Sequence, residues 1–137
     1  NLDSRKGEEL RVNNHVALLF HWKSLRRQIR IEGEVMPVGA AEADEYFASR
    51  ARGSRIGAWA SKQSAPMEGR FEFEAQIAKY TTKFGIGEIP RPENWSGFRV
   101  KPVAFEFWRD KKFRLHERLQ YDLITQENRW KLMELYP

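Results

Sequence analysis

The chain has 137 residues, of which 41% are apolar and 31% charged, and its formal net charge is +5 at pH 7. This size fits one domain with a real core, and the absence of cysteine excludes disulfides and thiolate metal sites. No apolar run approaches the roughly 20 residues of a membrane helix, and the three histidines have no metal-ligand spacing, so we expect a cytoplasmic protein without metal or membrane partner.

The first third of the chain predicts one helix and one hairpin. Ser4 is a suitable N-cap for a helix that ends near Val12. The continuous apolar run His15–Trp22 is typical of a buried strand. Residues Gln28–Val35 alternate polar and apolar as a half-buried strand does, and a turn at Lys23–Ser24 would join the two strands into an antiparallel hairpin.

Helical patterns fill the middle of the chain, at Ala40–Ser49, Ser54–Ser61 and Gly69–Phe84. Ala43, Tyr46 and Phe47 would share the buried face of the first helix. Arg52 and Gly53 are expected to separate the first helix from the second, because glycine disfavours a helix interior.

The last third is rich in strand patterns, at Gly97–Val100, Val103–Trp108, Phe113–Tyr121 and Trp130–Leu135. Strands followed by helices and again by strands indicate an α+β fold with an antiparallel sheet. Such a sheet removes its exposed edges best when it closes as a barrel.

Several polar residues fit an anionic or heteroaromatic ligand. Arg5 and Lys6 would lie in the first turn of a helix, where backbone N–H groups also attract an anion. The amide of Gln28 can donate to and accept from the edge of a heterocycle. For each of these residues, an ordinary solvated surface position is the commoner explanation.

Tyr46, Arg50 and Ser54 are spaced by four residues and would share one helix face if the helix continued. A phenol, a guanidinium and a hydroxyl together could bind a phosphate ester, with arginine binding as a fork. The alternative is an arginine on a solvated helix face, and the expected break before Ser54 weakens the spacing argument.

A row of basic residues follows an aromatic strand. In an extended strand Arg114, His116 and Arg118 would point to one side, where their charges repel unless an anion lies against them. His116 could donate a hydrogen bond there or take a proton, and the alternative is a partly buried histidine with a structural partner. The neighbouring Trp108 could contact a planar ligand, although core packing is the commoner role of such a side chain.

No Ser/His/Asp arrangement and no pair of carboxylates stands out, so catalysis by side chains alone is poorly supported. An organic cofactor that carries the chemistry remains open.

The sequence resembles the pyridoxamine (pyridoxine) 5′-phosphate oxidase family along essentially its whole length. The Ser-x-Ile-Gly-Ala-Trp and Arg-Leu-His-x-Arg motifs are highly specific in combination. The matching segments run in family order and are Ser4–Gly7, Leu18–Trp22, Arg27–Gln28, Tyr46–Arg50, Ser54–Ser61, Gln63–Ser64, Gly97–Val100, Phe105–Trp108 and Arg114–Arg118.

The resemblance implies one domain over residues 1–137, an antiparallel split β-barrel of the FMN-binding type with flanking helices. It also implies a homodimer with FMN at the subunit interface. The positions that match FMN-binding residues are Arg5, Lys6, Gln28, Gln63, Ser64, Trp108 and Arg118. The positions that match substrate-binding residues are Tyr46, Arg50, Ser54, Arg114, Leu115 and His116, of which Arg114 and His116 are also the implied catalytic residues.

The implied reaction converts pyridoxamine 5′-phosphate or pyridoxine 5′-phosphate to pyridoxal 5′-phosphate, a form of vitamin B6. FMN takes a hydride from C4′ of the substrate, and molecular oxygen is reduced to hydrogen peroxide. For the amine substrate, water then releases ammonia from the imine.

One departure from the family concerns an upstream strand that supplies phosphate contacts and has no counterpart in this sequence. The chain begins with Asn1 instead of methionine. We therefore expect an N-terminally truncated chain that by itself binds FMN weakly or not at all and is inactive.

Two alternatives remain from the sequence. One is a split-barrel flavin-binding protein without this oxidase activity. The other is a basic nucleic-acid-binding module, which aromatic strands and a charge of +5 would permit. The basic residues fall at ligand-binding positions of the family instead of along one stripe, so we expect no nucleic-acid partner.

Overall fold

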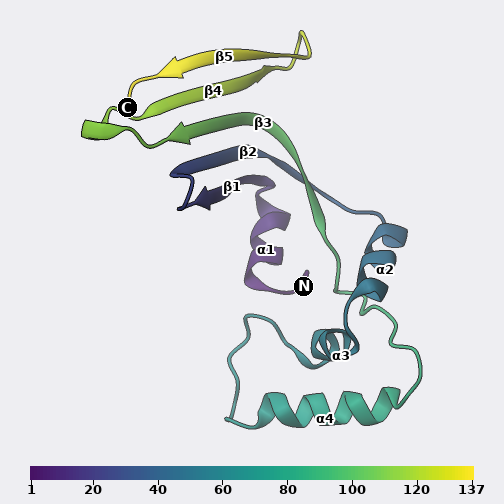
Figure 1. Ribbon diagram of the computed structural model, residues 1–137. Coiled ribbons are helices and arrows are strands. Elements are labelled where there is room, and N and C mark those ends of the chain that lie inside the picture. Colours follow the sequence, from purple (N-terminus) through teal and green to yellow (C-terminus); the bar gives the residue numbers. More distant parts are fainter. The chain divides into compact units, whose positions relative to one another are not determined.

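The computed structural model describes all 137 residues, and they divide into two compact units. The helical unit comprises Asn1–Asn13 and Pro37–Arg99, and the sheet unit comprises Asn14–Met36 and Val100–Pro137. The helices α1 to α4 belong to the first unit, and the second is built on a sheet, whose strands are drawn as arrows in Figure 1. None of the helices is long and apolar enough to cross a membrane.

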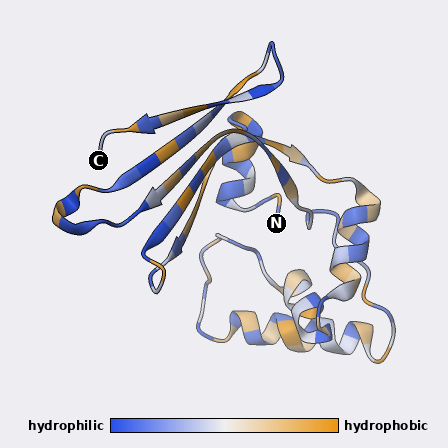
Figure 2. Ribbon diagram, turned by 45° about the horizontal axis from the view of Figure 1, so that its top comes forward, coloured by the Kyte–Doolittle hydropathy of each residue, from blue (hydrophilic) through white to orange (hydrophobic).

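The sheet has five strands in the order β1-β2-β3-β4-β5. Their bounds are His15–Trp22 (β1), Arg27–Pro37 (β2), Phe98–Arg109 (β3), Glu117–Ile124 (β4) and Arg129–Leu135 (β5). The β1–β2, β3–β4 and β4–β5 pairs are antiparallel. Apolar and polar residues alternate along β2, whereas β1 is a continuous apolar run; Figure 2 colours the strands by hydropathy. The expected α+β class with an antiparallel sheet is confirmed.

The predicted hairpin is present, with a register that runs from His15 opposite Glu34 to Trp22 opposite Arg27. Its burial was predicted wrongly, because Leu19 and Phe20 in β1 are 61% and 45% exposed. β1 is an edge strand that pairs with β2 alone. An apolar run indicates that a strand can be buried on both faces, but the sequence does not say whether a neighbouring element covers it.

The two short strands predicted at 97–100 and 103–108 form the single strand β3. Pro102 lies within it, yet the ladder to β4 begins only at Ala104, opposite Asp122. A proline is tolerated there because its missing N–H is not required by that ladder. A Cβ added to Gly33 in β2 would fall on the carbonyl oxygen of Lys101 in β3, so only glycine permits this approach of the two strands.

The helical unit begins with α1 (Arg5–Val12), which confirms the predicted first helix. The buried Ser4 is its N-cap, and the Ser4 hydroxyl accepts a hydrogen bond of 3.2 Å from the Gly7 N–H. A Cβ on Gly7 would collide with the Leu2 carbonyl, which fixes the path of the chain into the helix.

The other helices are α2 (Ala40–Ser49), α3 (Arg52–Ala60) and α4 (Glu72–Phe84). The helix break lies at Arg50 and Ala51, where the backbone is extended, and not at Arg52–Gly53 as predicted. Arg52 instead opens α3, and its guanidinium donates to the carbonyls of Gly85 and Gly87 beyond α4. These tertiary hydrogen bonds outweigh the weak helix propensity of Gly53.

The core of the helical unit is aromatic. Phe47, Ile56 and Ile89 form its buried centre. The side chains packed around them include Trp59, Tyr80, Phe84 and Trp95. Ala43 and Phe47 are buried as predicted, but Tyr46 is 66% exposed, so it does not share their core face.

Candidate functional site

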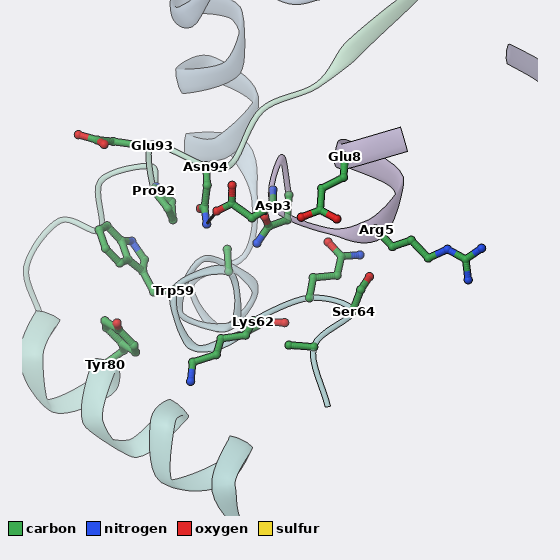
Figure 3. Close-up of a pocket in the computed structure, with 15 residues that line it drawn as sticks. Asp3, Arg5, Glu8, Trp59, Lys62, Ser64, Tyr80, Pro92, Glu93 and Asn94 are labelled. Carbon is green, nitrogen blue, oxygen red and sulfur yellow. Dashed lines mark hydrogen bonds between the residues drawn. The ribbon is translucent and has the colours of Figure 1, made fainter. Parts of the chain in front are cut away.

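A cavity of about 800 Å³ opens in the helical unit (Figure 3). Its lining comes from α1, from α3 and the turn after it, from α4, and from the Pro92–Asn94 loop. Three of the predicted FMN-binding residues, Arg5, Gln63 and Ser64, line this one cavity, whereas Lys6 is not among its lining residues.

Arg5 does not aim its charge into the cavity. Its Nε donates to Glu9 Oε1 at 2.8 Å, and this hydrogen bond raises the pKa of Arg5 above its ordinary value. Figure 3 shows the guanidinium pointing away from the other lining residues. Arg5 would therefore have to leave Glu9, or turn, to contact a ligand in the cavity.

The turn after α3 places Gln63 and Ser64 in the cavity wall. The Ala65 N–H donates to the Lys62 carbonyl at 2.9 Å, and Ser64 has a φ of 74°. A serine in this left-handed region is strained, and such strain is concentrated at functional sites.

Tyr46 and Arg50 meet at an aromatic side chain that the sequence analysis did not single out. The Trp95 ring stacks with Tyr46 at a centroid distance of 6.0 Å, and the Arg50 guanidinium lies 5.1 Å from the same ring. Arg50 Nη1 is buried and has no hydrogen-bond partner. Such an unpaired donor is costly to bury, which makes it a ready site for an anion.

The predicted shared helix face of Tyr46, Arg50 and Ser54 is wrong. The extended backbone at Arg50 and Ala51 separates α2 from α3 and ends the four-residue periodicity. Ser54 is exposed in the first turn of α3. The structure thus brings Tyr46 and Arg50 together at Trp95, and no hydrogen bond links Ser54 to either of them.

In the sheet unit, Gln28 and Trp108 line a cavity of about 470 Å³ with the apolar side chains of Trp22, Phe107 and Leu119. Trp108 lies directly opposite Arg118 in the β3–β4 register. Two further predicted FMN-binding residues, Gln28 and Trp108, therefore share a largely apolar hollow, whereas Arg118, opposite Trp108 in the register, is not among its lining residues.

The predicted strand through residues 114–118 is wrong, because β4 begins only at Glu117. Residues Lys112–Arg114 form a short 3₁₀ helix, η1, in which Phe113 and Arg114 have φ values of 59° and 61°. Arg114 and Leu115 are exposed. The row of three basic side chains on one face does not exist, because the backbone is not extended at its start.

His116 faces an acidic residue instead of two guanidiniums. Its Nδ1 accepts a 3.4 Å hydrogen bond from the Lys111 N–H and lies 3.2 Å from Asp110 Oδ1. Its ring lies against Trp108, with centroids 4.7 Å apart. His116 is thereby held beside a predicted FMN-binding residue, and its hydrogen bond and ion pair are made by Nδ1 and not by Nε2.

Glu106 is a buried carboxylate that the sequence analysis missed. It is 8% exposed and accepts hydrogen bonds from Arg118 Nε at 2.7 Å and from Arg30 Nη2 at 3.2 Å. The Arg118 hydrogen bond is the main cause that lowers the pKa of Glu106 and raises that of Arg118. The available signal was a lone acidic residue between Phe105 and Phe107 in an aromatic strand.

From the lowered pKa of Glu106 we predict that the folded protein loses stability against unfolding in acid. Its folded-state pKa lies below the ordinary value of 4.5, so its stabilising contribution is complete above that pH and is lost as the pH falls through the lower folded value. Urea unfolding of Glu106→Gln should therefore depend less on pH below about 4.5 than unfolding of the parent protein. Identical acid dependence in the two proteins would contradict the prediction.

Comparisons with known proteins cover the whole chain. Residues 1–84 match a family model described as pyridoxamine 5′-phosphate oxidase. Residues 95–137 match the pyridoxine 5′-phosphate oxidase C-terminal dimerisation region.

Two relatives named pyridoxine/pyridoxamine 5′-phosphate oxidase match over all 137 residues. The protein from Agrobacterium fabrum is 56% identical and that from Maricaulis maris is 58% identical. The chain spans 66% and 62% of their respective lengths, which is slightly less than two thirds.

Two solved structures have the same fold. PhzG from Burkholderia lata, in complex with tetrahydrophenazine-1-carboxylic acid, has a TM-score of 0.89 at 32% identity over 98% of this chain and 65% of its own. An FMN-binding protein related to pyridoxamine 5′-phosphate oxidase, from Nostoc punctiforme, has a TM-score of 0.73 at 13% identity over 100% of this chain and 70% of its own. These matches confirm the split-barrel fold class.

Proposed function

The chain belongs to the pyridoxamine 5′-phosphate oxidase family, and from this premise we propose that it is part of an FMN-dependent oxidase. The substrates would be pyridoxamine 5′-phosphate and pyridoxine 5′-phosphate, and the products pyridoxal 5′-phosphate and hydrogen peroxide. The observation that best supports the proposal from the structure is the buried, unpartnered Nη1 of Arg50 beside Tyr46.

The Arg50 site would bind the phosphate of the substrate. A phosphate oxygen would give the unpaired Nη1 the hydrogen bond it lacks, and a charge-assisted bond of this kind is stronger than a neutral one. Tyr46, which is exposed and stacked on the same tryptophan, would add a phenolic donor. The Ser54 hydroxyl is the third group of this proposed site.

The donor groups of both units fit FMN, a phosphorylated heteroaromatic group. In the helical unit, Arg5, Lys6, Gln63 and Ser64 would bind its phosphate end. In the sheet unit, Gln28, Trp108 and Arg118 would bind its ring, because the apolar hollow there carries a few polar groups that could orient a planar ligand. FMN, when bound, would supply hydride acceptance from C4′ and electron transfer to oxygen.

The residues near η1 would act on the substrate. The exposed Arg114 would bind and orient it together with Leu115, and the strained backbone at Phe113 and Arg114 would set the direction of that guanidinium. His116 would hold or move a proton at Nε2, because its Nδ1 is already engaged by the Lys111 N–H and faces Asp110.

The assembly would be a homodimer in which residues 1–137 of each subunit make one FMN-binding split-barrel domain. Support comes from the match of residues 95–137 to a dimerisation region. Residues 1–137 alone would bind FMN weakly, because the resemblance assigns some of the contacts to the FMN phosphate to an upstream strand. Tight FMN binding by residues 1–137 in a fluorescence-quenching titration would contradict this. Cell fractionation would test the cytoplasmic location.

The proposal is tested by assaying the purified full-length protein. It should be yellow and should release peroxide when given pyridoxine 5′-phosphate or pyridoxamine 5′-phosphate. A yellow protein that oxidises neither compound would indicate a flavin-binding relative without this activity. A colourless protein that binds single-stranded DNA in a salt-dependent way would favour the nucleic-acid-binding alternative.

Changing Arg50 to lysine should raise KM for pyridoxine 5′-phosphate by about 10- to 100-fold, which corresponds to the roughly 1.5–3 kcal/mol of a hydrogen bond to a charged group. Lysine keeps the charge but cannot make the planar two-pronged contact of arginine. The matched control is unphosphorylated pyridoxine, for which KM should be the same in the variant and the parent protein. An equal effect on both compounds would refute a phosphate-binding role.

A further inference from the structure

Glu106 is buried between two arginines that come from different strands. Arg30 belongs to β2 and Arg118 to β4, and Glu106 lies on β3 between them in the sheet order. Each arginine donates to a different carboxylate oxygen, Arg118 to Oε1 and Arg30 to Oε2. Without the carboxylate, the two guanidiniums would be left as like charges on the two strands that flank β3, with no acceptor between them on β3.

The guanidinium of Arg118 is fixed at two points. Its Nε donates to Glu106, and its Nη1 donates to the backbone carbonyl of Tyr136 at 3.0 Å. Because a guanidinium is planar and rigid, two such contacts determine its orientation. Its Nη2 makes no hydrogen bond, so the N–H groups of Nη2 are the donors that remain for a ligand.

We infer that Glu106 is a positioning residue for flavin binding: it holds Arg118 at Nε, so that the free Nη2 donor is already oriented before FMN binds. The inference rests on the proposed function, in which Arg118 contacts FMN and Glu106 does not. An oriented donor loses less conformational freedom on binding than a mobile one, so the carboxylate would strengthen flavin binding without touching the flavin.

The main test measures FMN affinity of the full-length protein by fluorescence quenching. Glu106→Gln should raise the Kd for FMN by about 10-fold, within the range expected for a charge-assisted hydrogen bond. Arg30→Gln is the matched control, because it removes the other ion pair of Glu106 and leaves the Arg118 contact in place. It should change the Kd less than 3-fold, and an equal loss in both variants would overturn the inference.

A second comparison tests whether Glu106 acts through Arg118. In an Arg118→Ala background, Glu106→Gln should weaken FMN binding no further, because residues that act as a unit are not additive. A full additional 10-fold loss in that background would overturn the inference. If Glu106→Gln does not fold, Glu106→Asp replaces it in both comparisons: it keeps the charge but shortens the reach to Arg118, and it should also weaken binding.

A measurement without flavin separates this inference from the proposed function. In flavin-free protein, the Arg118 Nε–H should give a resolved NMR signal that exchanges slowly with water, and Glu106→Gln should abolish that protection. An unchanged signal in the variant would show that Glu106 does not hold Arg118. Failure of the parent protein to bind FMN would instead contradict the proposed function, whatever the NMR signal shows.

Discussion

Replacing Arg114 by alanine is expected to lower kcat/KM for pyridoxine 5′-phosphate by about 10- to 100-fold while FMN remains bound. The change removes a guanidinium that would orient the substrate, and a hydrogen bond from a charged group contributes roughly 1.5–3 kcal/mol. Arg114 is exposed, so its loss should leave the fold intact. Steady-state assays on the flavin-loaded protein measure the effect, and the absorption spectrum reports flavin occupancy.

Lys112→Ala is the control for this experiment. Lys112 lies in the same 3₁₀ helix, is also exposed and carries the same charge, but has no proposed role. Its removal should leave kcat/KM within 2- to 3-fold of the parent value. If the two variants lower kcat/KM by the same factor, the effect comes only from the positive charge of this turn. The proposed contact between Arg114 and the substrate would then be wrong.

Replacing Phe47 by alanine is expected to destabilise the protein by about 3–5 kcal/mol, as large-to-small changes of buried phenylalanines do. Phe47 is 2% exposed and packs edge-on against Trp95, with ring centroids 5.0 Å apart. Its loss would leave a cavity at the centre of the helical core. Urea unfolding of the flavin-free protein, followed by tryptophan fluorescence, measures the change.

The adjacent Tyr46→Ala provides the matched control, because it also removes an aromatic ring beside Trp95 but from an exposed position. It should cost less than about 1 kcal/mol of unfolding free energy and should instead raise KM for the phosphorylated substrate. A loss below about 1 kcal/mol for Phe47→Ala would show that this core can repack around the missing ring.

Local sequence signals predicted the elements that depend on local interactions. Ser4 indicated the start of α1, and its hydroxyl accepts the expected hydrogen bond. Alternation in Gln28–Val35 indicated β2, and pairing with His15–Trp22 followed because only a short turn joins the two strands. The resemblance to the family supplied the candidate ligand-binding residues, and the structure gathers several of them around one cavity in each unit.

The sequence failed where backbone conformation is determined by distant contacts. Phe113 and Arg114 both have positive φ values, which side-chain alternation does not reveal. Arg52 opens α3 because its guanidinium binds carbonyls more than 30 residues away along the chain. The same limit applies to Trp95, which brings Tyr46 and Arg50 together from beyond α4.

By itself, the sequence determined the α+β class, most of the helices and strands, and the family motifs. This is because hydrophobic periodicity, helix caps and motifs depend on residues that are close together in the sequence. Only the tertiary structure decided how Arg118 is held and which partner His116 faces. The Arg30–Glu106 contact joins residues 76 positions apart. Whether a charged side chain is paired, buried or free depends on such long-range neighbours, and those are set by the packing of the whole chain.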